Sequence, residues 1–152
     1  MQQNQKASIT GIGSYLPSKV LTNYDLEKMV DTSDDWIIQR TGIKERRIVE
    51  NGQITSDLAT YASLRAMEDA GVSPGDLDMI ITSTITPDHI FPSTSCYIQQ
   101  KIGASRASAF DILAACAGFI YALSVGESFV NSGAMKTVLV VGAECLSKIT
   151  DY

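Results

Sequence analysis

The sequence predicts an α/β fold with a mostly parallel sheet whose two faces are covered by helices. Short apolar segments alternate with longer helical ones, which is the pattern of parallel strands joined by helical crossovers. The segment 137–141, Thr-Val-Leu-Val-Val, lacks the polar alternation of a half-exposed strand and therefore suits a strand covered on both faces. A chain of 152 residues is long enough for one domain with a sizeable core.

The first third of the chain is predicted to hold short elements. They are a strand over 7–13, a helix over 24–30, a helix over 33–42 and an edge strand over 44–49. Asn23 is the candidate N-cap of the first helix, and Ser33 is the candidate N-cap of the second. Gly42 suits the C-cap of the second helix, because glycine accepts the positive φ that this position requires.

The remaining elements alternate more regularly. They are a helix over 56–70, a strand over 79–82, a helix over 92–103, a strand over 109–113, a helix over 116–130 and a strand over 137–141. Within residues 114–125, Ser124 and the Tyr121 hydroxyl are the only clearly polar groups. A helix that is apolar all round is expected to be buried between layers, so the fold is expected to be more than three layers deep.

Composition excludes several classes of function. The formal net charge of −5 argues against a nucleic-acid-binding protein, which usually carries a basic excess. No apolar run approaches the ~20 residues of a membrane helix, and the first residues lack the apolar stretch of a signal peptide. We therefore expect no nucleic-acid or membrane partner and a cytoplasmic location.

The sequence predicts neither a metal nor a cofactor. Its three cysteines, Cys96, Cys116 and Cys145, are widely spaced, which fits neither a disulfide framework nor a zinc site. The glycines of the segment 11–13 resemble the start of a dinucleotide-binding motif, but the third glycine position is occupied by Leu16. No nicotinamide cofactor is therefore implied.

Cys116 is the candidate catalytic residue. It follows a predicted strand and lies in or next to the first turn of a helix, where unpaired N–H groups and the helix dipole favour a thiolate. In open α/β sheets, ligand sites form at the carboxyl ends of strands. The alternative is that Cys116 packs as a small hydrophobic residue. Cys96 and Cys145 lack this context and are expected to be inert.

Trp36 and Arg40 are candidate binding residues, because their spacing places them on one helix face. An indole can stack on adenine, and a guanidinium can bind phosphate with two donors. Basic residues gather over 40–47, which suits an anionic partner. The alternative is an intrahelical cation–π contact beside a solvated charge cluster.

Three other polar residues are expected to have no catalytic role. His89 lies in a loop between two prolines and is expected to be a solvated side chain. Asp88 and Asp111 could suggest an acid–base pair, but nothing in the sequence fixes their separation.

The segment 109–119, Ala-Phe-Asp-Ile-Leu-Ala-Ala-Cys-Ala-Gly-Phe, resembles the active-site segment of beta-ketoacyl-acyl-carrier-protein synthase III. Segments 11–17, 34–37, 40–43 and 91–93 resemble the same family, so the resemblance covers essentially the whole chain. It implies a thiolase-like fold with five αβαβα layers. Residues 1–152 would form the N-terminal half, which carries the nucleophilic cysteine, and the C-terminal half is absent from this sequence.

The resemblance also implies an activity. Cys116 would take an acyl group from acetyl-CoA or a similar primer, and decarboxylative Claisen condensation with malonyl-acyl carrier protein would give 3-oxoacyl-acyl carrier protein. No cofactor is implied. Thr32, Trp36 and Arg40 would contact the nucleotide portion of the acyl-CoA. Phe91 would reach across the interface of a homodimer to line the partner's acyl pocket, or would instead be an ordinary anchoring core residue.

Family members carry a catalytic His and Asn in the later half of the chain, so residues 1–152 alone are expected not to condense. Arg46 and Arg47 are hypothesised to dock the acidic carrier protein. The alternatives are a polyketide-type ketosynthase, a hydroxymethylglutaryl-CoA synthase, or a non-catalytic half-domain that binds acyl-CoA or carrier protein.

Overall fold

A computed structural model describes residues 6–151 and divides the chain into two compact units. Unit 1 contains the described residues up to Tyr15 together with Ile54–Glu144. Unit 2 contains Leu16–Gln53 and the described residues from Cys145 onward.

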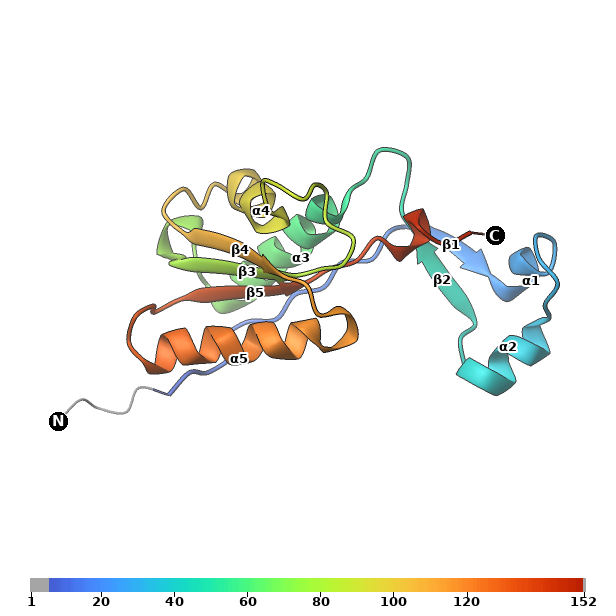
Figure 1. Cartoon of the computed structure of the whole chain (residues 1–152), viewed down its shortest axis with the longest axis horizontal. Helices are drawn as coiled ribbons and strands as arrows, with labels where there is room; N and C mark the ends of the chain where they lie inside the picture. Colours follow the sequence, from blue (N-terminus) through green and yellow to red (C-terminus); the bar gives the residue numbers. More distant parts are fainter. Residues whose placement is uncertain (1–5, 152) are drawn as a thin grey trace. The chain divides into compact units, whose positions relative to one another are not determined.

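Unit 1 is built on a three-stranded parallel sheet in the order β4–β3–β5 (Figure 1). The strands are β3 Met79–Ser83, β4 Ser108–Ile112 and β5 Val138–Gly142. β3 lies in the centre, with Ile81 opposite Phe110 of β4 and Val140 of β5. Because both pairings are parallel, the carboxyl ends of all three strands share one edge of the sheet. The predicted parallel α/β architecture is confirmed.

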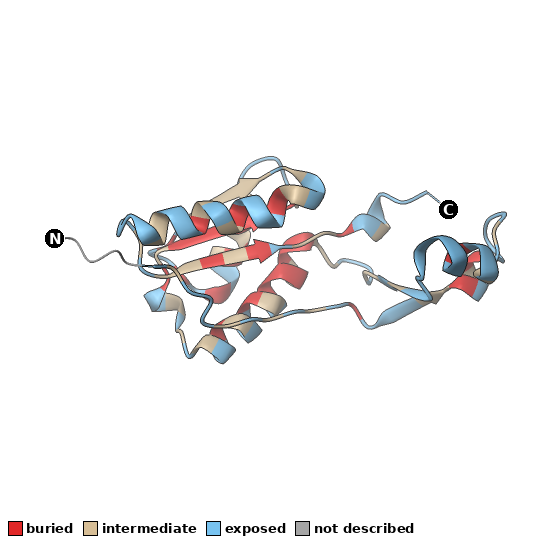
Figure 2. Cartoon of the chain, turned by 90° about the horizontal axis from the view of Figure 1, so that it is seen from below, coloured by how far each residue is buried: buried red, intermediate tan, exposed pale blue. Residues whose placement is uncertain are grey.

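Helices cover both faces of this sheet (Figure 1). They are α3 Thr55–Ala70 and α4 Thr94–Ile102 on one face and α5 Gly118–Asn131 on the other, with a short 3-10 turn, η1, at Pro74–Asp76. Ile80 packs in the core cluster that α3 and α4 share with the sheet, and Ile81 packs with Ala122 of α5. Figure 2 shows the buried residues of unit 1 concentrated in the strands and on the sheet-facing sides of the helices.

The outer face of α5 departs from expectation. The buried residues of α5 are Gly118, Ala122 and Gly126, which are all small. A Cβ at Gly126 would lie 3.1 Å from Val140 Cγ2 of β5. Ile120 and Tyr121 are 60% and 56% exposed. The described layers cover only the sheet-facing side of α5, so the expected burial of its other face is not seen within this chain.

The glycine-rich amino-terminal segment was expected to be a strand over 7–13, and this expectation is also wrong. The described part is extended but unpaired. It runs along α3, where a side chain on Gly11 or Gly13 would collide with the helix backbone. The Ile12 N–H donates to the Asp69 carboxylate at 2.9 Å, so its hydrogen bond goes to a side chain of α3 and not to a neighbouring strand.

Unit 2 consists of a two-stranded antiparallel ribbon, two helices and a short 3-10 turn. These are β1 Lys19–Thr22, α1 Asn23–Leu26, α2 Asp34–Thr41, β2 Glu45–Ile48 and η3 Leu146–Lys148. Ser33 caps α2 by accepting from the Trp36 N–H, and Gly42 ends it with φ of 71°. These boundaries and the strand at β2 are confirmed. β1 was not predicted, because four mixed residues carry no periodic signal.

Asn23 is not the N-cap that the sequence suggested. Thr22 caps α1 in a reciprocal arrangement with Asp25. Asn23 is fully buried, and its Nδ2 donates to Asp34 Oδ1 and to the Ile43 carbonyl, each at 2.8 Å. Its Oδ1 accepts from the Arg46 guanidinium. This single amide therefore links α1, the start of α2 and β2, in a unit that has few buried apolar side chains.

Candidate active site

Cys116 lies at the tip of a tight turn between β4 and α5. The 3-10 turn η2, Ala115–Ala117, connects the strand to the helix, and Cys116 is exposed. The regular helix begins at Gly118, two residues later than expected, so Cys116 precedes the first helical turn. The sulfur is thereby presented at the carboxyl edge of the sheet, where ligand sites of α/β folds form.

The backbone of this turn is strained. Ala115 has φ of 46°, in the left-handed region that costs an ordinary L-residue about 1–2 kcal/mol. The Ala117 N–H donates to the Ala114 carbonyl at 3.1 Å and closes the turn. Strain of this kind concentrates at functional sites, where it holds a side chain in a set position. Here it occurs directly before Cys116, which is exposed.

Gly118 lets α5 begin directly over the end of the central strand. It is buried, and a Cβ at this position would overlap the Ser83 hydroxyl and lie 3.2 Å from Ser83 Cβ. Ser83 is the last residue of β3 and is itself buried. A side chain at Gly118 would therefore require the Ser83 side chain or the start of α5 to shift. The requirement for glycine at position 118 could not be predicted from the sequence, because it comes from Ser83, which is distant along the chain.

The start of α5 favours an anion. The N-cap residue of α5 is Ala117, whose side chain cannot accept a hydrogen bond from the first N–H groups of the helix. Uncapped N–H groups and the helix dipole together stabilise negative charge within the first turn. Cys116 lies two residues before Gly118, the first residue of α5, which is a position typical of a nucleophilic cysteine.

The other two cysteines have different surroundings. Cys96 is partly buried in α4 and accepts from Ser93 Oγ at 3.2 Å. Cys145 is buried. Cys96 lies inside a helix, and Cys145 precedes only the short 3-10 turn Leu146–Lys148. Across the described residues no group of three or more His, Cys, Asp or Glu side chains could hold a metal ion, and no helix is long and apolar enough to cross a membrane.

Trp36 and Arg40 come together in unit 2. The Arg40 Cζ lies 4.7 Å from the centroid of the indole, so the cation–π contact is present. Trp36 is nonetheless 53% exposed and Arg40 is exposed, which leaves both groups open to a ligand. Thr32 is half-buried and lies just before the α2 cap. The cation–π contact between Trp36 and Arg40 therefore leaves both side chains accessible to a ligand.

The two arginines of β2 differ in their surroundings. The Arg46 guanidinium is used inside unit 2 by Asn23. Arg47 is exposed, donates to the Pro17 carbonyl at 3.3 Å and forms a salt bridge of 3.3 Å with Glu45. A role in docking a partner is thus better suited to Arg47 than to Arg46.

Phe91 lies in the loop that joins β3 to α4. It is 87% exposed and its neighbour Ile90 is 100% exposed, so within this chain Phe91 anchors no core. His89 is exposed, and its ring centroid lies 5.5 Å from that of Tyr97. Phe91 and Cys116 follow neighbouring strands of one sheet, and both lie beyond its carboxyl edge.

Asp88 and Asp111 do not form an acid–base pair but serve the backbone. Asp88 Oδ1 accepts from the Ser56 N–H at 3.1 Å, at the start of α3. Asp111 accepts from the Thr94 and Ser95 N–H groups at 2.6 and 2.8 Å, at the start of α4. Each carboxylate thus holds the first turn of a different helix.

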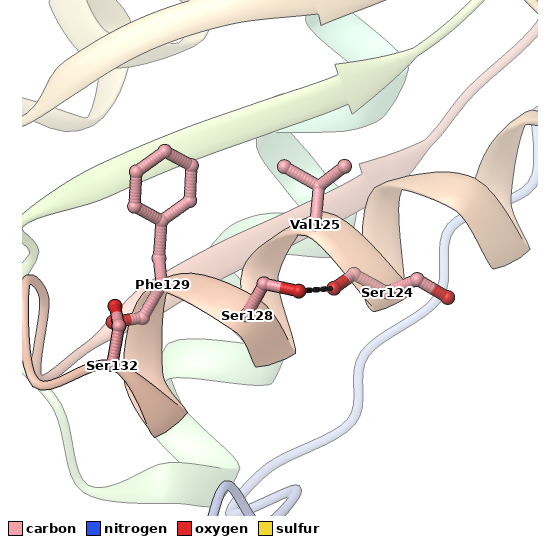
Figure 3. Close-up of a pocket in the computed structure, with 5 residues that line it drawn as sticks. All are labelled: Ser124, Val125, Ser128, Phe129 and Ser132. Carbon is pink, nitrogen blue, oxygen red and sulfur yellow. Dashed lines mark hydrogen bonds between the residues drawn. The ribbon is translucent and has the colours of Figure 1, made fainter.

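A shallow hollow of about 420 Å³ lies along α5 (Figure 3). It is lined by Ser124, Val125, Ser128, Phe129 and Ser132. Val125 and Phe129 point towards the sheet, and Ser128 Oγ donates to the Ser124 carbonyl at 2.8 Å (Figure 3). The hollow begins roughly two helical turns beyond Cys116 and so lies apart from the cysteine turn.

The parallel sheet, its helical layers and the cysteine turn at its carboxyl edge define a thiolase-like α/β protein. The solved structure of 3-oxoacyl-[acyl-carrier-protein] synthase III from Aquifex aeolicus superposes with a TM-score of 0.91 at 55% identity, over 94% of this chain and 46% of that one. The priming beta-ketosynthase of the R1128 polyketide pathway superposes with a TM-score of 0.93 at 37% identity, over 99% of this chain and 46% of that one.

Sequence relatives agree. The beta-ketoacyl-[acyl-carrier-protein] synthase III of Caldanaerobacter subterraneus subsp. tengcongensis is 62% identical over 146 residues, which are 96% of this chain and 44% of that protein. A sequence model of the family described as 3-oxoacyl-[acyl-carrier-protein] synthase III matches residues 110–152. The chain belongs to this family, as the motifs indicated, and spans about half the length of the curated relatives it matches.

Proposed function

We propose that the protein, at its full natural length, is a condensing enzyme that initiates type II fatty acid synthesis. The observation that carries the proposal is the exposed Cys116 at the uncapped start of α5. The relatives are named as synthases of beta-ketoacyl- or 3-oxoacyl-[acyl-carrier-protein], which supports a product carried by acyl carrier protein. The primer is acetyl-CoA or a similar acyl-CoA.

In the first step the Cys116 thiolate attacks the thioester carbonyl of the primer. The bond between the acyl carbon and the CoA sulfur breaks, and CoA leaves as a thiolate that takes up a proton. One thioester replaces another, so the exchange is close to balanced and needs no cofactor. The sulfur attacks from the turn at the start of α5 and is released at the same place in the second step.

In the second step malonyl-acyl carrier protein loses carbon dioxide. The electron pair of the broken carbon–carbon bond forms a new bond to the acyl carbon on Cys116, and the cysteine leaves as a thiolate. Developing oxyanion charge needs donors placed in advance. The His and Asn that the family resemblance implies for this step lie outside the 152 residues, so this segment alone is proposed to be inactive in condensation.

Nucleotide binding is assigned to residues in and just before α2. Thr32, Trp36 and Arg40 hold the nucleotide end of the acyl-CoA, and the open indole face beside a guanidinium supports this role. Phe91 lines the acyl pocket of a second copy of the chain in a homodimer, and its exposure supports a role outside its own core. Arg47 is the candidate contact for acyl carrier protein. The acidic composition supports a cytoplasmic enzyme.

The test is to incubate the full-length protein with acetyl-CoA and malonyl-acyl carrier protein and to detect 3-oxoacyl-acyl carrier protein by mass spectrometry. Product is expected from the full-length protein and not from residues 1–152 alone. The likeness to a priming ketosynthase keeps a polyketide role as the second candidate, and stronger activity with longer primers than with acetyl-CoA would favour it. CoA binding without any product would indicate a non-catalytic binding module.

A further inference from the structure

The loop between β3 and α4 is tied at its base and open at its tip. Residues 84–93 connect the two elements. The tip residues Ile90 and Phe91 project into solvent at 100% and 87% exposure. Thr84, at the base, is fully buried. Because the tip residues are exposed, their position depends on the contacts that hold the base of the loop.

Glu144 is the main tie at the start of the loop. Its Oε1 accepts from the Ile85 N–H at 2.9 Å, and its Oε2 accepts from the Thr86 N–H at 3.1 Å and from Thr86 Oγ1 at 2.6 Å. Thr84 Oγ1 donates to the same carboxylate at 3.3 Å. Charge-assisted hydrogen bonds of this kind are about twice as strong as neutral ones.

Further ties hold the same loop from α3. Thr55 Oγ1 donates to the Thr86 carbonyl at 2.5 Å, and the Ser56 N–H donates to Asp88 at 3.1 Å. Beyond the tip, Asp111 holds the first turn of α4. The stretch without such a tie is therefore short, and it includes Ile90 and Phe91.

The place of Glu144 in the sheet links it to the reaction. Glu144 follows β5, the loop follows β3 and Cys116 follows β4, and β3 lies between the other two strands. The carboxylate thus reaches from one outer strand to the loop of the central strand, which neighbours the strand that ends at the cysteine turn. Displacing the loop base would move the Phe91 tip.

We propose that Glu144 is a positioning residue, which fixes the loop that carries Phe91 and thereby sets which acyl groups are accepted. The inference rests on the proposed function, because it assumes that Phe91 lines an acyl pocket. Glu144 touches no reacting atom and acts only through the loop.

The chain offers a closely matched control at the opposite edge of the same strand pair. Asp78 precedes β3 and accepts from the Lys136 and Thr137 N–H groups, which precede β5, at 2.7 and 3.0 Å. Both carboxylates therefore bridge two backbone N–H groups between the β3 and β5 segments. Only Glu144 does so at the edge that carries Cys116. A purely structural role therefore predicts a loss of stability in either variant and no change of acyl-CoA selectivity in either.

The experiment compares Glu144→Gln with Asp78→Asn in the full-length protein. Glutamine keeps the shape but turns one acceptor into a donor that opposes the backbone N–H groups. Two quantities are measured: the ratio of kcat/KM for acetyl-CoA to that for a longer acyl-CoA, and amide hydrogen exchange in residues 85–93. Glu144→Gln is expected to reduce the discrimination ratio about tenfold and to speed exchange in the loop. Asp78→Asn is expected to keep the ratio within about twofold, the range of unrelated surface changes.

Equal changes of the ratio in both variants would overturn the proposal, as would an unchanged ratio in Glu144→Gln. If Glu144→Gln does not fold, Thr86→Val removes one hydroxyl donor and is expected to shift the ratio in the same direction by less. Absence of any acylation in the wild-type protein would refute the proposed function itself. A wild-type protein that is acylated normally, together with variants of unchanged selectivity, would instead refute only the role of Glu144.

Discussion

Gly118 and Ser83 touch without space for a single methyl group between them. Gly118 begins α5 and Ser83 ends β3, and a Cβ on the glycine would overlap the serine hydroxyl. This contact brings the start of the helix onto the end of the central strand and fixes the height of the cysteine turn above the sheet.

Gly118→Ala should therefore destabilise the protein and slow acylation of Cys116. Overpacking of a tight contact costs about 2 kcal/mol, measured as the free energy of unfolding in denaturant. Gly75→Ala is the control, because the nearest atom to a Cβ there is 3.9 Å away, and it should change stability by less than about 0.5 kcal/mol. The double change Gly118→Ala with Ser83→Ala should recover part of the loss, since Ser83 Cβ remains at 3.2 Å. Equal stability of the two glycine variants would contradict the contact.

Asn23→Ala should loosen unit 2. The change leaves Asp34, the Ile43 carbonyl and Arg46 without the amide that joins them, at a cost of roughly 3 kcal/mol for several buried hydrogen bonds, two of them to charged groups. Faster amide hydrogen exchange across α2 is expected as the measurable sign of this loosening. Asn51→Ala, at an exposed turn of the same unit, should leave exchange unchanged. Unchanged hydrogen exchange across α2 in Asn23→Ala would show that the hydrogen bonds of Asn23 do not hold this helix.

Arg40→Ala and Trp36→Ala should weaken binding of CoA to the full-length protein. A lost charged hydrogen bond or a lost base stack is worth about 1–3 kcal/mol, so each dissociation constant should rise roughly tenfold or more by titration calorimetry. Arg65→Ala is the matched control, because Arg65 lies over Tyr15 in a similar exposed contact at 5.5 Å. An equal loss of affinity in the control would argue against a nucleotide site on α2.

Asp78 should contribute a pH-dependent part of stability. Hydrogen bonds from the Lys136 and Thr137 N–H groups lower the pKa of its carboxyl below the ordinary value of 3.8. A lowered folded-state pKa stabilises the folded protein above the unfolded-state pKa, and this contribution is lost as the pH falls below 3.8 and through the folded value. Asp78→Asn should flatten the acid limb of a plot of unfolding free energy against pH. An unchanged limb would contradict the assignment.

Local sequence signals predicted those features whose causes are local. The Ser33 cap, the Gly42 end of α2 and the apolar strand β3 follow from residues within one or two turns. Asn23 was misassigned because a helix cap and a buried amide look alike in sequence, and its partners Asp34 and Ile43 lie well beyond the first turn.

Features fixed by distant partners could not be predicted. The amino-terminal segment has the composition of a strand, but strand formation needs a paired neighbour, and Ile12 instead bonds to Asp69 of α3. Glu144 meets Ile85 and Thr86 only because two parallel strands end at one edge. The position of Cys116 between a strand and a helix could be predicted because its surroundings are local: a strand, small residues and a helix start. Its role as a nucleophile stays a prediction.

The most direct test is to map the acyl group. The full-length protein is incubated with labelled acetyl-CoA, digested, and each cysteine peptide is analysed by mass spectrometry, with Cys116→Ala and Cys96→Ala variants alongside. Label is expected on the Cys116 peptide, retained in Cys96→Ala, absent in Cys116→Ala and discharged when malonyl-acyl carrier protein is added. Label on Cys96 or Cys145, or CoA binding that never labels a cysteine, would contradict the assignment of Cys116 as the acyl acceptor.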